Sequence, residues 1–277
     1  MGAPSGGWVL WAGTVGFSTP VLERLEAAAA VDIQRFSVTP PDVESAAANG
    51  LTAVELGRRI RDRGYDIVMD PLVNWYGGTP YPGSRFGRYS PDEVLRMCAD
   101  LGVASVNLIG QPSHDASVDQ LATSFAAICD KAGALGAQAH LEFMPITAIA
   151  SLAAGWEIVR TAGHPNGGLC FDTWHFFRSD PDFELLEAIP GERIFSVQVS
   201  DAGPEALPDI REDTMNRRLP GDGVFDLDRV VRVLQRIGAL TWVGAEVISP
   251  DLAAMAPAVA AQLADGRVRA LVAAATS

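Results

Sequence analysis

The chain has 277 residues, of which 48% are hydrophobic and 20% are charged, as in a globular protein with a large core. It carries 21 basic and 34 acidic residues, which gives a net charge of −13. An acidic chain without basic runs is not expected to bind nucleic acid, because that binding needs Lys and Arg to neutralise phosphates.

Short strand-like runs alternate with longer amphipathic runs along the chain, as the spacing of the apolar residues indicates. The short runs predict eight strands: Val9–Ala12, Asp32–Val38, Asp66–Leu72, Ser105–Ile109, Gln138–Met144, Gly167–Asp172, Ile194–Val199 and Trp242–Val247. The longer runs predict eight helices: Pro20–Ala30, Ala53–Arg63, Pro91–Leu101, Val118–Leu135, Ser151–Ala162, Asp182–Ile189, Leu227–Ile237 and a C-terminal segment from Leu252 onward.

Glycines mark the ends of four predicted helices. Gly64, Gly102, Gly136 and Gly238 each precede a strand-like run, which is typical of a helix-to-strand loop. Eight such units predict one α/β domain over residues 1–277, a (β/α)₈ TIM barrel with parallel strands and an active site at their C-terminal ends. The alternative is an open doubly wound sheet, but its first strand-to-helix turn is usually G-x-G-x-x-G, and WAGTVGFSTP lacks that motif.

Residue usage excludes several kinds of chemistry. Lys131 is the only lysine and lies in a predicted helix, so neither Schiff-base catalysis nor a Walker-type phosphate loop is expected. Cys98, Cys129 and Cys170 form no C-x-x-C pair, which favours a reducing compartment over disulfides or a thiolate zinc site. The chain also lacks a charged leader and a run of about 18 apolar residues. We therefore expect a cytoplasmic protein without membrane association.

The last four predicted strands each carry one oxygen-bearing side chain near the C-terminal end: Glu142, Asp172, Gln198 and Glu246. Side chains alternate along a strand, so the positions two residues below point the same way. Those positions hold mostly small residues, namely His140, Cys170, Ser196 and Gly244. The four side chains thus have room for an ion or a substrate at the barrel mouth.

Three converging carboxylates need a cation, because their charges would otherwise repel one another. Three carboxylates and one amide oxygen form a hard ligand set that suits Mn²⁺ or Mg²⁺. Zn²⁺ ranks lower because it usually takes imidazole or thiolate ligands, and Co²⁺ is a further alternative. The expected cofactor is therefore one divalent metal ion, held by Glu142, Asp172, Gln198 and Glu246.

The segments HLEFMP, FDTWHFF, VQVSDA, RRLPGDG and GAEV resemble the signature segments of the xylose-isomerase-like sugar phosphate isomerase/epimerase superfamily. The resemblance extends from residue 8 to residue 260 and implies a (β/α)₈ barrel with one divalent metal at the four positions above. It also implies that Glu142 and Glu246 are the acid/base pair on opposite faces of the substrate. His175 and either Arg217 or Arg218 would contact substrate oxygens.

One position departs from the sugar-epimerase pattern. Epimerases and inosose-type members usually have His where this chain has Gln198, whereas Gln is similar to what bacterial 3-dehydroshikimate dehydratases of the superfamily use. The DNA-repair endonucleases of the superfamily hold three zinc ions with many histidines. This chain has only four histidines, so that branch is not expected.

Further residues are candidates from their position. His175 could polarise an oxygen or protonate a leaving hydroxyl, and Asp201 could support the metal from behind its ligands or cap a turn. Arg217 and Arg218 are a candidate clamp for a carboxylate or phosphate, the alternative being a solvated pair. Seven aromatic residues fall at the expected mouth: Trp11, Phe17, Trp75, Tyr76, Trp174, Phe176 and Phe177. Of these we expect Trp11, Trp75 and Trp174 to bind a substrate with a ring or an apolar body, unless they only pack the loops.

The expected activity is a metal-dependent isomerase or epimerase acting on a sugar, a sugar derivative or a related hydroxy-ketone. A glutamate would remove the proton next to the carbonyl and form an enediolate. The alternative is a dehydratase or lyase that shares this first step, and a third is a non-catalytic binding subunit. The expected ligand is a small molecule. A homo-oligomer is also possible, although no sequence motif specifies one.

Overall fold

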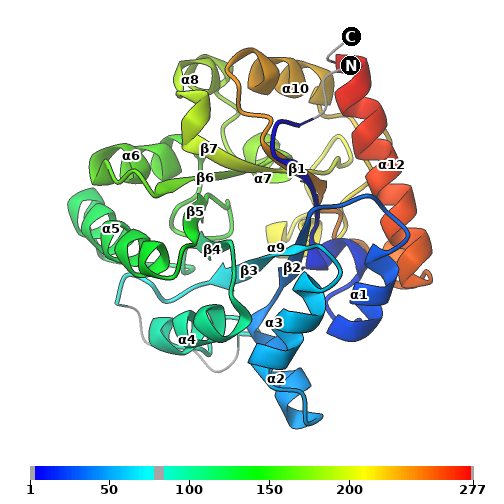
Figure 1. The fold of residues 1–277 in the computed structure, drawn as a ribbon. Coiled ribbons are helices and arrows are strands. Elements are labelled where there is room, and N and C mark those ends of the chain that lie inside the picture. The colour runs from blue at the N-terminus through cyan, green and yellow to red at the C-terminus, as the bar shows by residue number, and fades with distance from the viewer. Residues whose placement is uncertain (1–3, 78–83, 276–277) are drawn as a thin grey trace. The chain divides into compact units, whose positions relative to one another are not determined.

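The computed structural model describes residues 4–77 and 84–275, and its eight strands form one closed parallel barrel in chain order (Figure 1). The barrel predicted from the sequence is confirmed, and the alternative of an open doubly wound sheet is not observed. Residues 78–83, in the loop expected after the third strand, lie outside the described residues. The strands are β1 Gly7–Leu10, β2 Arg35–Val38, β3 Asp66–Leu72, β4 Ser105–Ile109, β5 Gln138–Glu142, β6 Gly167–Asp172, β7 Ile194–Val199 and β8 Trp242–Ala245.

The strands β3, β4, β6 and β7 have the predicted bounds, whereas β5 and β8 end two residues earlier than expected. Both strands end early because a backbone N–H group just beyond each end donates to an acceptor outside the sheet. The Met144 N–H donates to the carbonyl of Ile149, and the Val247 N–H donates to the hydroxyl of Thr14. Glu142 is therefore the last residue of β5, and Glu246 directly follows β8.

Helices follow the strands along the chain (Figure 1). They are α1 Val21–Ala28, α2 Pro40–Ala48, α3 Ala53–Arg61, α4 Pro91–Leu101, α5 Val118–Ala134, α6 Leu152–Ala162, α7 Thr173–Arg178, α8 Phe183–Ala188, α9 Ile210–Asp213, α10 Leu227–Arg236, α11 Pro250–Ala253 and α12 Pro257–Ala275. Short 3₁₀ turns lie at Ala12–Val15 and Gly191–Arg193. In the part of the chain that the structure describes, no helix is long and apolar enough to cross a bilayer.

Helix α2 is the main element that the sequence reading missed. Its two leading prolines favour a loop interpretation, but proline is well tolerated in the first helical turn, where its missing N–H has no partner to lose. Thr39 begins the helix with a capping box, in which its hydroxyl accepts from the Asp42 N–H and the Asp42 carboxylate accepts from the Thr39 N–H.

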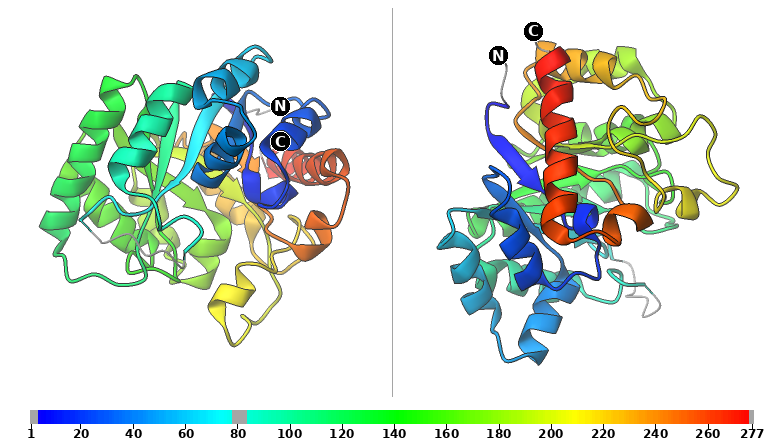
Figure 2. Two further views of the ribbon diagram at one scale, coloured as in Figure 1. Left: turned by 90° about the horizontal axis from the view of Figure 1, so that it is seen from below. Right: turned by 90° about the vertical axis from the view of Figure 1, so that its right-hand side faces the viewer.

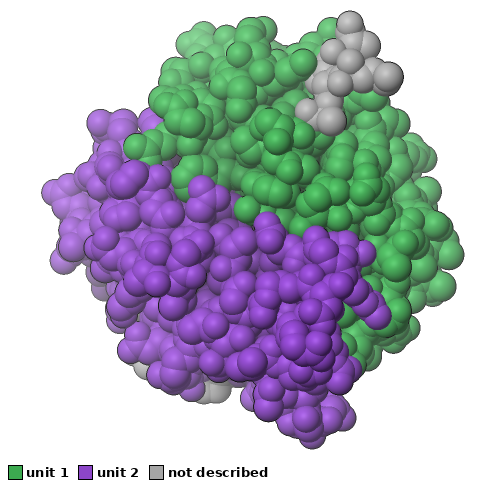
Figure 3. Space-filling model, viewed as in Figure 1, with its two compact units in different colours: residues 1–36, 171–277 green, residues 37–170 purple. Residues whose placement is uncertain are grey.

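The chain divides into two compact units, residues 1–36 with 171–277 and residues 37–170 (Figure 3). The prediction of a single domain over residues 1–277 thus stays a prediction. In the first unit, the long helix α12 packs along both α1 and α10 (Figure 2). Its buried positions are small or β-branched, which lets it lie close to its neighbours: Ala260, Ala261, Ala264, Val268 and Val272.

In the second unit, α5 packs against α6 and β5, and α3 packs against α4. Gly167 at the start of β6 allows this close packing, because a Cβ atom there would lie 2.7 Å from the ring of Phe125 and 2.8 Å from the Cys129 sulfur. This layer of helices holds strands β3 to β5, which carry the polar residues described below for this unit.

Candidate metal and substrate site

The best-defined polar group of the first unit centres on Asp172, the last residue of β6. Its Oδ1 accepts a hydrogen bond from the backbone N–H of His175 at 3.0 Å and so caps the short helix α7. Its Oδ2 accepts a hydrogen bond from Nη1 of Arg217 at 2.7 Å. The carboxylate is fully buried, so both of its oxygens are engaged away from solvent.

Arg217 joins Asp172 to Glu246. Its backbone N–H donates to the carbonyl of Ile248, which fixes the chain beside the end of β8. The same Nη1 lies 3.0 Å from the carbonyl oxygen of Glu246 and 3.4 Å from its Oε2. Its Nη2 donates to the hydroxyl of Thr214. A single buried guanidinium therefore faces two of the four residues that the sequence predicts as metal ligands.

The charges around Asp172 favour its ionised form. Burial alone would raise the pKa of this carboxyl group, but the positive charges of Arg217 and His175, with the hydrogen bonds from both, outweigh burial. The pKa of Asp172 consequently lies below its ordinary value, and the group is a carboxylate at neutral pH.

His175 lies beside this pair in the same unit. Its Nε2 is 4.0 Å from Oδ2 of Asp172 and 3.5 Å from Nη2 of Arg217. Trp174 packs edge-on against the imidazole, and the guanidinium of Arg217 lies over the Trp174 ring at 5.2 Å. The candidate residues His175, Arg217 and Trp174 thus surround Asp172.

Gln198 is fully buried in β7 and pairs with Gly244 in β8. Gly244 must lack a side chain, because a Cβ there would overlap the Val9 carbonyl oxygen and lie 3.0 Å from the ring of Trp11. Trp11 is itself fully buried, and its indole Nε1 has no hydrogen-bond partner among the described residues. Trp11 thus packs beside β8, and its role in substrate binding stays a prediction.

Asp201 supports the loop that carries Arg217. Its carboxylate accepts four backbone hydrogen bonds, from the N–H groups of Ala202, Gly221, Gly223 and Phe225 at 2.8–3.1 Å. Its backbone also forms an isolated antiparallel bridge with Arg218. The Asp201 carboxylate thus caps the turns of this loop, and its role behind the metal ligands stays a prediction.

The structure separates the two candidate arginines. Arg217 is buried against Asp172 and Glu246, whereas Arg218 is exposed and donates to the carbonyl of Asp222. Arg217 is thus the arginine of this loop that lies with the predicted ligands.

The second unit holds Glu142, the fourth predicted ligand residue. Its Oε2 accepts a hydrogen bond at 2.5 Å from the side-chain amide of Asn107 in β4, and the same amide nitrogen donates to Oδ1 of Asp70 in β3 at 2.9 Å. All three side chains are buried. Sequence reasoning missed Asp70 and Asn107, although a polar residue inside an apolar strand was the signal that identified Gln198.

The predicted ligands on neighbouring strands are not register partners of one another. Glu142 pairs with Cys170, and Asp172 follows two residues further along β6. In the first unit Gln198 pairs with Gly244, and Glu246 again follows two residues later. The strands of a barrel are tilted and staggered, so two residues that pair across neighbouring strands need not lie at the same height along the barrel axis.

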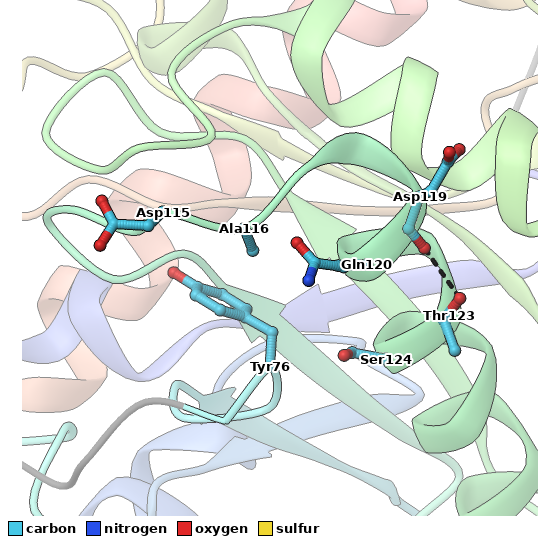
Figure 4. A pocket seen from close by; sticks show the side chains of 7 residues that line it. All are labelled: Tyr76, Asp115, Ala116, Asp119, Gln120, Thr123 and Ser124. Carbon is cyan, nitrogen blue, oxygen red and sulfur yellow. Dashed lines mark hydrogen bonds between the residues drawn. The ribbon is translucent and has the colours of Figure 1, made fainter.

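A shallow hollow of about 630 Å³ lies in the second unit between Tyr76 and the first two turns of α5 (Figure 4). Its polar side chains include Asp115, Gln120 and Ser124. The neighbouring Trp75 is buried, and its indole N–H donates to the carbonyl of Ile109. Of these two expected mouth aromatics, Tyr76 is the one that borders open space.

The donor set fits a divalent cation. Asp172 and Glu246 offer carboxylate oxygens, Gln198 offers an amide oxygen in the same unit, and Glu142 ends its strand in the second unit. Oxygen donors of this kind suit Mg²⁺ and Mn²⁺, and the nearby imidazole of His175 extends the choice to Zn²⁺.

Comparison with known families gives a match over most of the chain. The sequence model of the family described as "xylose isomerase-like TIM barrel" matches residues 25–267. The crystal structure of the IolI protein with a bound zinc atom is similar in fold, with a TM-score of 0.82 and 20% sequence identity over 97% of this chain and 98% of that one.

Two curated relatives are enzymes. Inosose isomerase of Bacillus subtilis (strain 168) is 27% identical over an alignment of 169 residues, with 57% of this chain and 59% of the relative covered. The 3-dehydroshikimate dehydratase of Pseudomonas aeruginosa is 29% identical over 231 residues, covering 68% of this chain and 32% of the relative. The chain therefore spans less than two thirds of the length of either relative.

Proposed function

Because the chain belongs to the xylose isomerase-like TIM barrel family, we propose that it is a divalent-metal-dependent isomerase or epimerase of a sugar, a sugar derivative or a related hydroxy-ketone. The observation that carries this proposal is the pair of buried carboxylates Asp172 and Glu246, which one guanidinium joins at the ends of β6 and β8. The similarity to inosose isomerase, whose name denotes a cyclic hydroxy-ketone substrate, supports it.

Glu142, Asp172, Gln198 and Glu246 would hold the ion. The closed strand order supports this, because the C-terminal ends of all parallel strands lie at one end of a barrel. We propose Mn²⁺ or Mg²⁺ as the ion, with Co²⁺ and Zn²⁺ as alternatives, and the zinc atom named for the IolI structure supports a divalent site in this fold. A bound ion would supply positive charge beside the ketone oxygen of the substrate and make the neighbouring C–H bond more acidic.

The two glutamates would move the proton. One of Glu142 and Glu246 would take the proton from the carbon next to the carbonyl and leave an enediolate. Return of a proton to the same carbon from the opposite face by the other glutamate would complete an epimerisation. Return of the proton to the adjacent carbon, with transfer of the hydroxyl proton to the former carbonyl oxygen, would complete an isomerisation.

Arg217 and His175 would orient the substrate. The Arg217 guanidinium cannot lose its proton and would donate to substrate oxygens. His175 would donate to a hydroxyl or carbonyl oxygen from its position beside Asp172. Trp11, Trp75 and Trp174 would form the apolar walls of the site behind these polar groups.

A dehydratase is the second candidate, and Gln198 favours it. The proposed ligand position that is His in related epimerases is Gln in this chain, and the Pseudomonas aeruginosa dehydratase is among the similar proteins. In this case His175 would protonate the leaving hydroxyl after the shared first step. A binding subunit without turnover is less well supported, because both acid/base candidates are present.

The remaining proposals concern the surroundings of the protein. The ligand would be a small molecule, and the oligomeric state stays a prediction. The thiols of Cys98, Cys129 and Cys170 are buried and form no disulfide bond in the described residues, which supports a reducing compartment such as the cytoplasm.

Solvent exchange tests the proposal. The Mn²⁺-loaded protein is incubated in D₂O with inosose, D-fructose or 3-dehydroshikimate, and deuterium on carbon is followed by NMR. We expect exchange with at least one ketone, no exchange after metal removal, and about one divalent ion per chain in the purified protein. Full exchange in the metal-free protein would refute the metal site.

The variant Glu246→Gln tests the acid/base assignment. Gln has the same size as Glu but cannot take the proton, so exchange should fall by at least about 100-fold while the fold is kept. Near-normal exchange in this variant would reassign the base. With inosose as substrate, a new ultraviolet enone absorbance would identify a dehydratase, because loss of water gives a conjugated product that epimerisation does not give.

A further inference from the structure

A three-residue group in the second unit takes no part in the chemistry proposed above, apart from Glu142 itself. The side-chain nitrogen of Asn107 bridges two carboxylates, with Oε2 of Glu142 at 2.5 Å and Oδ1 of Asp70 at 2.9 Å. The three residues come from the neighbouring strands β3, β4 and β5, and the side chain of Asn107 is fully buried.

The two carboxylates determine which way the Asn107 amide points. The alternative orientation would place the amide oxygen against two carboxylate oxygens, and the three acceptors would repel one another. The NH₂ group must therefore face Glu142 and Asp70, and the amide oxygen must point away from both.

This orientation leaves the Asn107 Oδ1 buried and without a hydrogen-bond partner among the described residues. A buried acceptor without a partner costs about 1–3 kcal/mol of folding free energy, and natural proteins rarely keep one without a use. The unsatisfied atom belongs to the amide group whose nitrogen binds Glu142, and the two atoms share one carbon, so the unsatisfied acceptor lies close to this carboxylate.

We propose that Asn107 is a substrate-positioning residue with two roles: its NH₂ group fixes the Glu142 carboxylate, and its Oδ1 accepts a hydrogen bond from a hydroxyl group of the substrate. This proposal rests on the proposed function, in which Glu142 binds the metal and moves the proton. Asp70 holds the other N–H of the amide and so prevents it from turning away from Glu142.

The charges around Asn107 also restrict which group of the substrate can lie next to it. Two carboxylates and a carbonyl oxygen attract a hydrogen-bond donor and repel an anion. The group next to Asn107 is therefore a neutral hydroxyl, and a substrate carboxylate or phosphate would lie elsewhere. A cyclic polyhydroxy-ketone such as inosose has hydroxyl groups on the carbons next to its carbonyl and meets this requirement.

Two substitutions separate the two roles. Asn107→Asp keeps the size and an acceptor oxygen but removes the NH₂ donor to Glu142, whereas Asn107→Ala removes both donor and acceptor. Asn166→Ala is the matched control, because the Asn166 amide also donates to two acceptors in the same unit, the carbonyls of Cys129 and Ala137. The measurements are Mn²⁺ binding by calorimetry and the kcat and KM of deuterium exchange into inosose.

Both Asn107 variants should bind Mn²⁺ at least about 10-fold more weakly and should have a lower kcat, because removing a partner behind a metal ligand has effects of this size. Only Asn107→Ala should also raise KM, since Asn107→Asp still offers an acceptor to the substrate hydroxyl. Should Asn107→Ala not fold, the lower kcat and unchanged KM of Asn107→Asp alone would support the proposal. Asn166→Ala should match the wild type in Mn²⁺ affinity, kcat and KM.

The outcomes distinguish this proposal from the proposed function. If the wild-type protein neither binds Mn²⁺ nor exchanges any of the three ketones, the proposed function is wrong and this proposal falls with it. If the wild type does both and the Asn107 variants behave like Asn166→Ala, only the role of Asn107 is overturned.

Discussion

Nη1 of Arg217 donates a hydrogen bond to Oδ2 of Asp172 over 2.7 Å, and neither side chain is more than 1% exposed to solvent. A guanidinium stays charged at any pH that a folded protein survives, so Asp172 has a cationic partner whenever it is ionised. A buried pair of this kind contributes little net stability, but removing one partner leaves a charge that neither water nor protein compensates.

The first prediction concerns that uncompensated charge. Arg217→Met keeps most of the side-chain volume and removes the positive charge, so the metal-free protein should lose about 3–5 kcal/mol of unfolding free energy. Urea denaturation monitored by circular dichroism measures this loss. Arg218→Met is the control, because Arg218 is exposed, and its substitution should change stability by no more than about 0.5 kcal/mol. Equal effects of the two substitutions would contradict this account.

The second prediction is an acid dependence of stability. The folded pKa of Asp172 is lowered, so its ionised form contributes stability that is complete above the unfolded pKa of about 3.9. That contribution is lost as the pH falls through the lower folded pKa. Asp172→Asn should therefore be less stable than wild type at pH 7 in the metal-free state and should lose less stability on acidification. Thermal unfolding between pH 7 and pH 3 measures the two slopes, and Asp180→Asn, at an exposed position, should keep the wild-type slope.

The third prediction concerns the loop behind Arg217. Asp201→Asn replaces one acceptor oxygen by an NH₂ group that would face backbone N–H groups, so we expect a loss of about 3 kcal/mol in unfolding free energy. Hydrogen exchange should accelerate at the amides of Gly221, Gly223 and Phe225 before it changes in α12. Glu205→Gln, on the exposed part of the same loop, should leave both measurements unchanged.

The fourth prediction contrasts two glycines. Gly244→Ala should destabilise the protein by at least about 2 kcal/mol, because the new methyl group would overlap the Val9 carbonyl oxygen and press on Trp11. Gly266 lies inside α12 with open space around it, so Gly266→Ala should raise stability by about 0.5–1 kcal/mol. Thermal unfolding of both variants should give shifts of opposite sign, and shifts of the same sign would contradict the packing described.

The fifth prediction concerns thiol reactivity. Burial raises the pKa of Cys98 and of Cys129 to about 12, so both stay protonated at pH 8, and the thiolate is the reactive form. The native protein should react with Ellman's reagent at these positions at least about 100 times more slowly than the unfolded protein does. Fast labelling of Cys98 or Cys129 under native conditions would show that α4 or α5 opens readily.

The alternation of strands and helices was predictable because each element carries its own apolar period and a glycine often ends the helix. Glu142, Asp172 and Gln198 were predicted as ligands from single strands, because each is a polar residue near the C-terminal end of an apolar run. Helix α2 was not predictable in this way, because its starting prolines are as common in loops as in first helical turns.

The partners of the site residues were harder to predict. Asn107 and Asp70 lie 37 positions apart, and only strand register brings them together. The choice between Arg217 and Arg218 depends on one peptide step in a loop, which decides whether a side chain points inward or to solvent. Local sequence carries no information of either kind.

The antiparallel bridge between Asp201 and Arg218 has a consequence for engineering. The bridge joins the two ends of the loop between these residues, whereas residues 204–209 in the outer part of the loop are largely exposed. Because the ends are fixed to each other and Arg217 is anchored to Ile248, the outer turn can be shortened, lengthened or replaced as a cassette. This loop is therefore suited to carry a new binding segment, while the buried guanidinium of Arg217 stays in position.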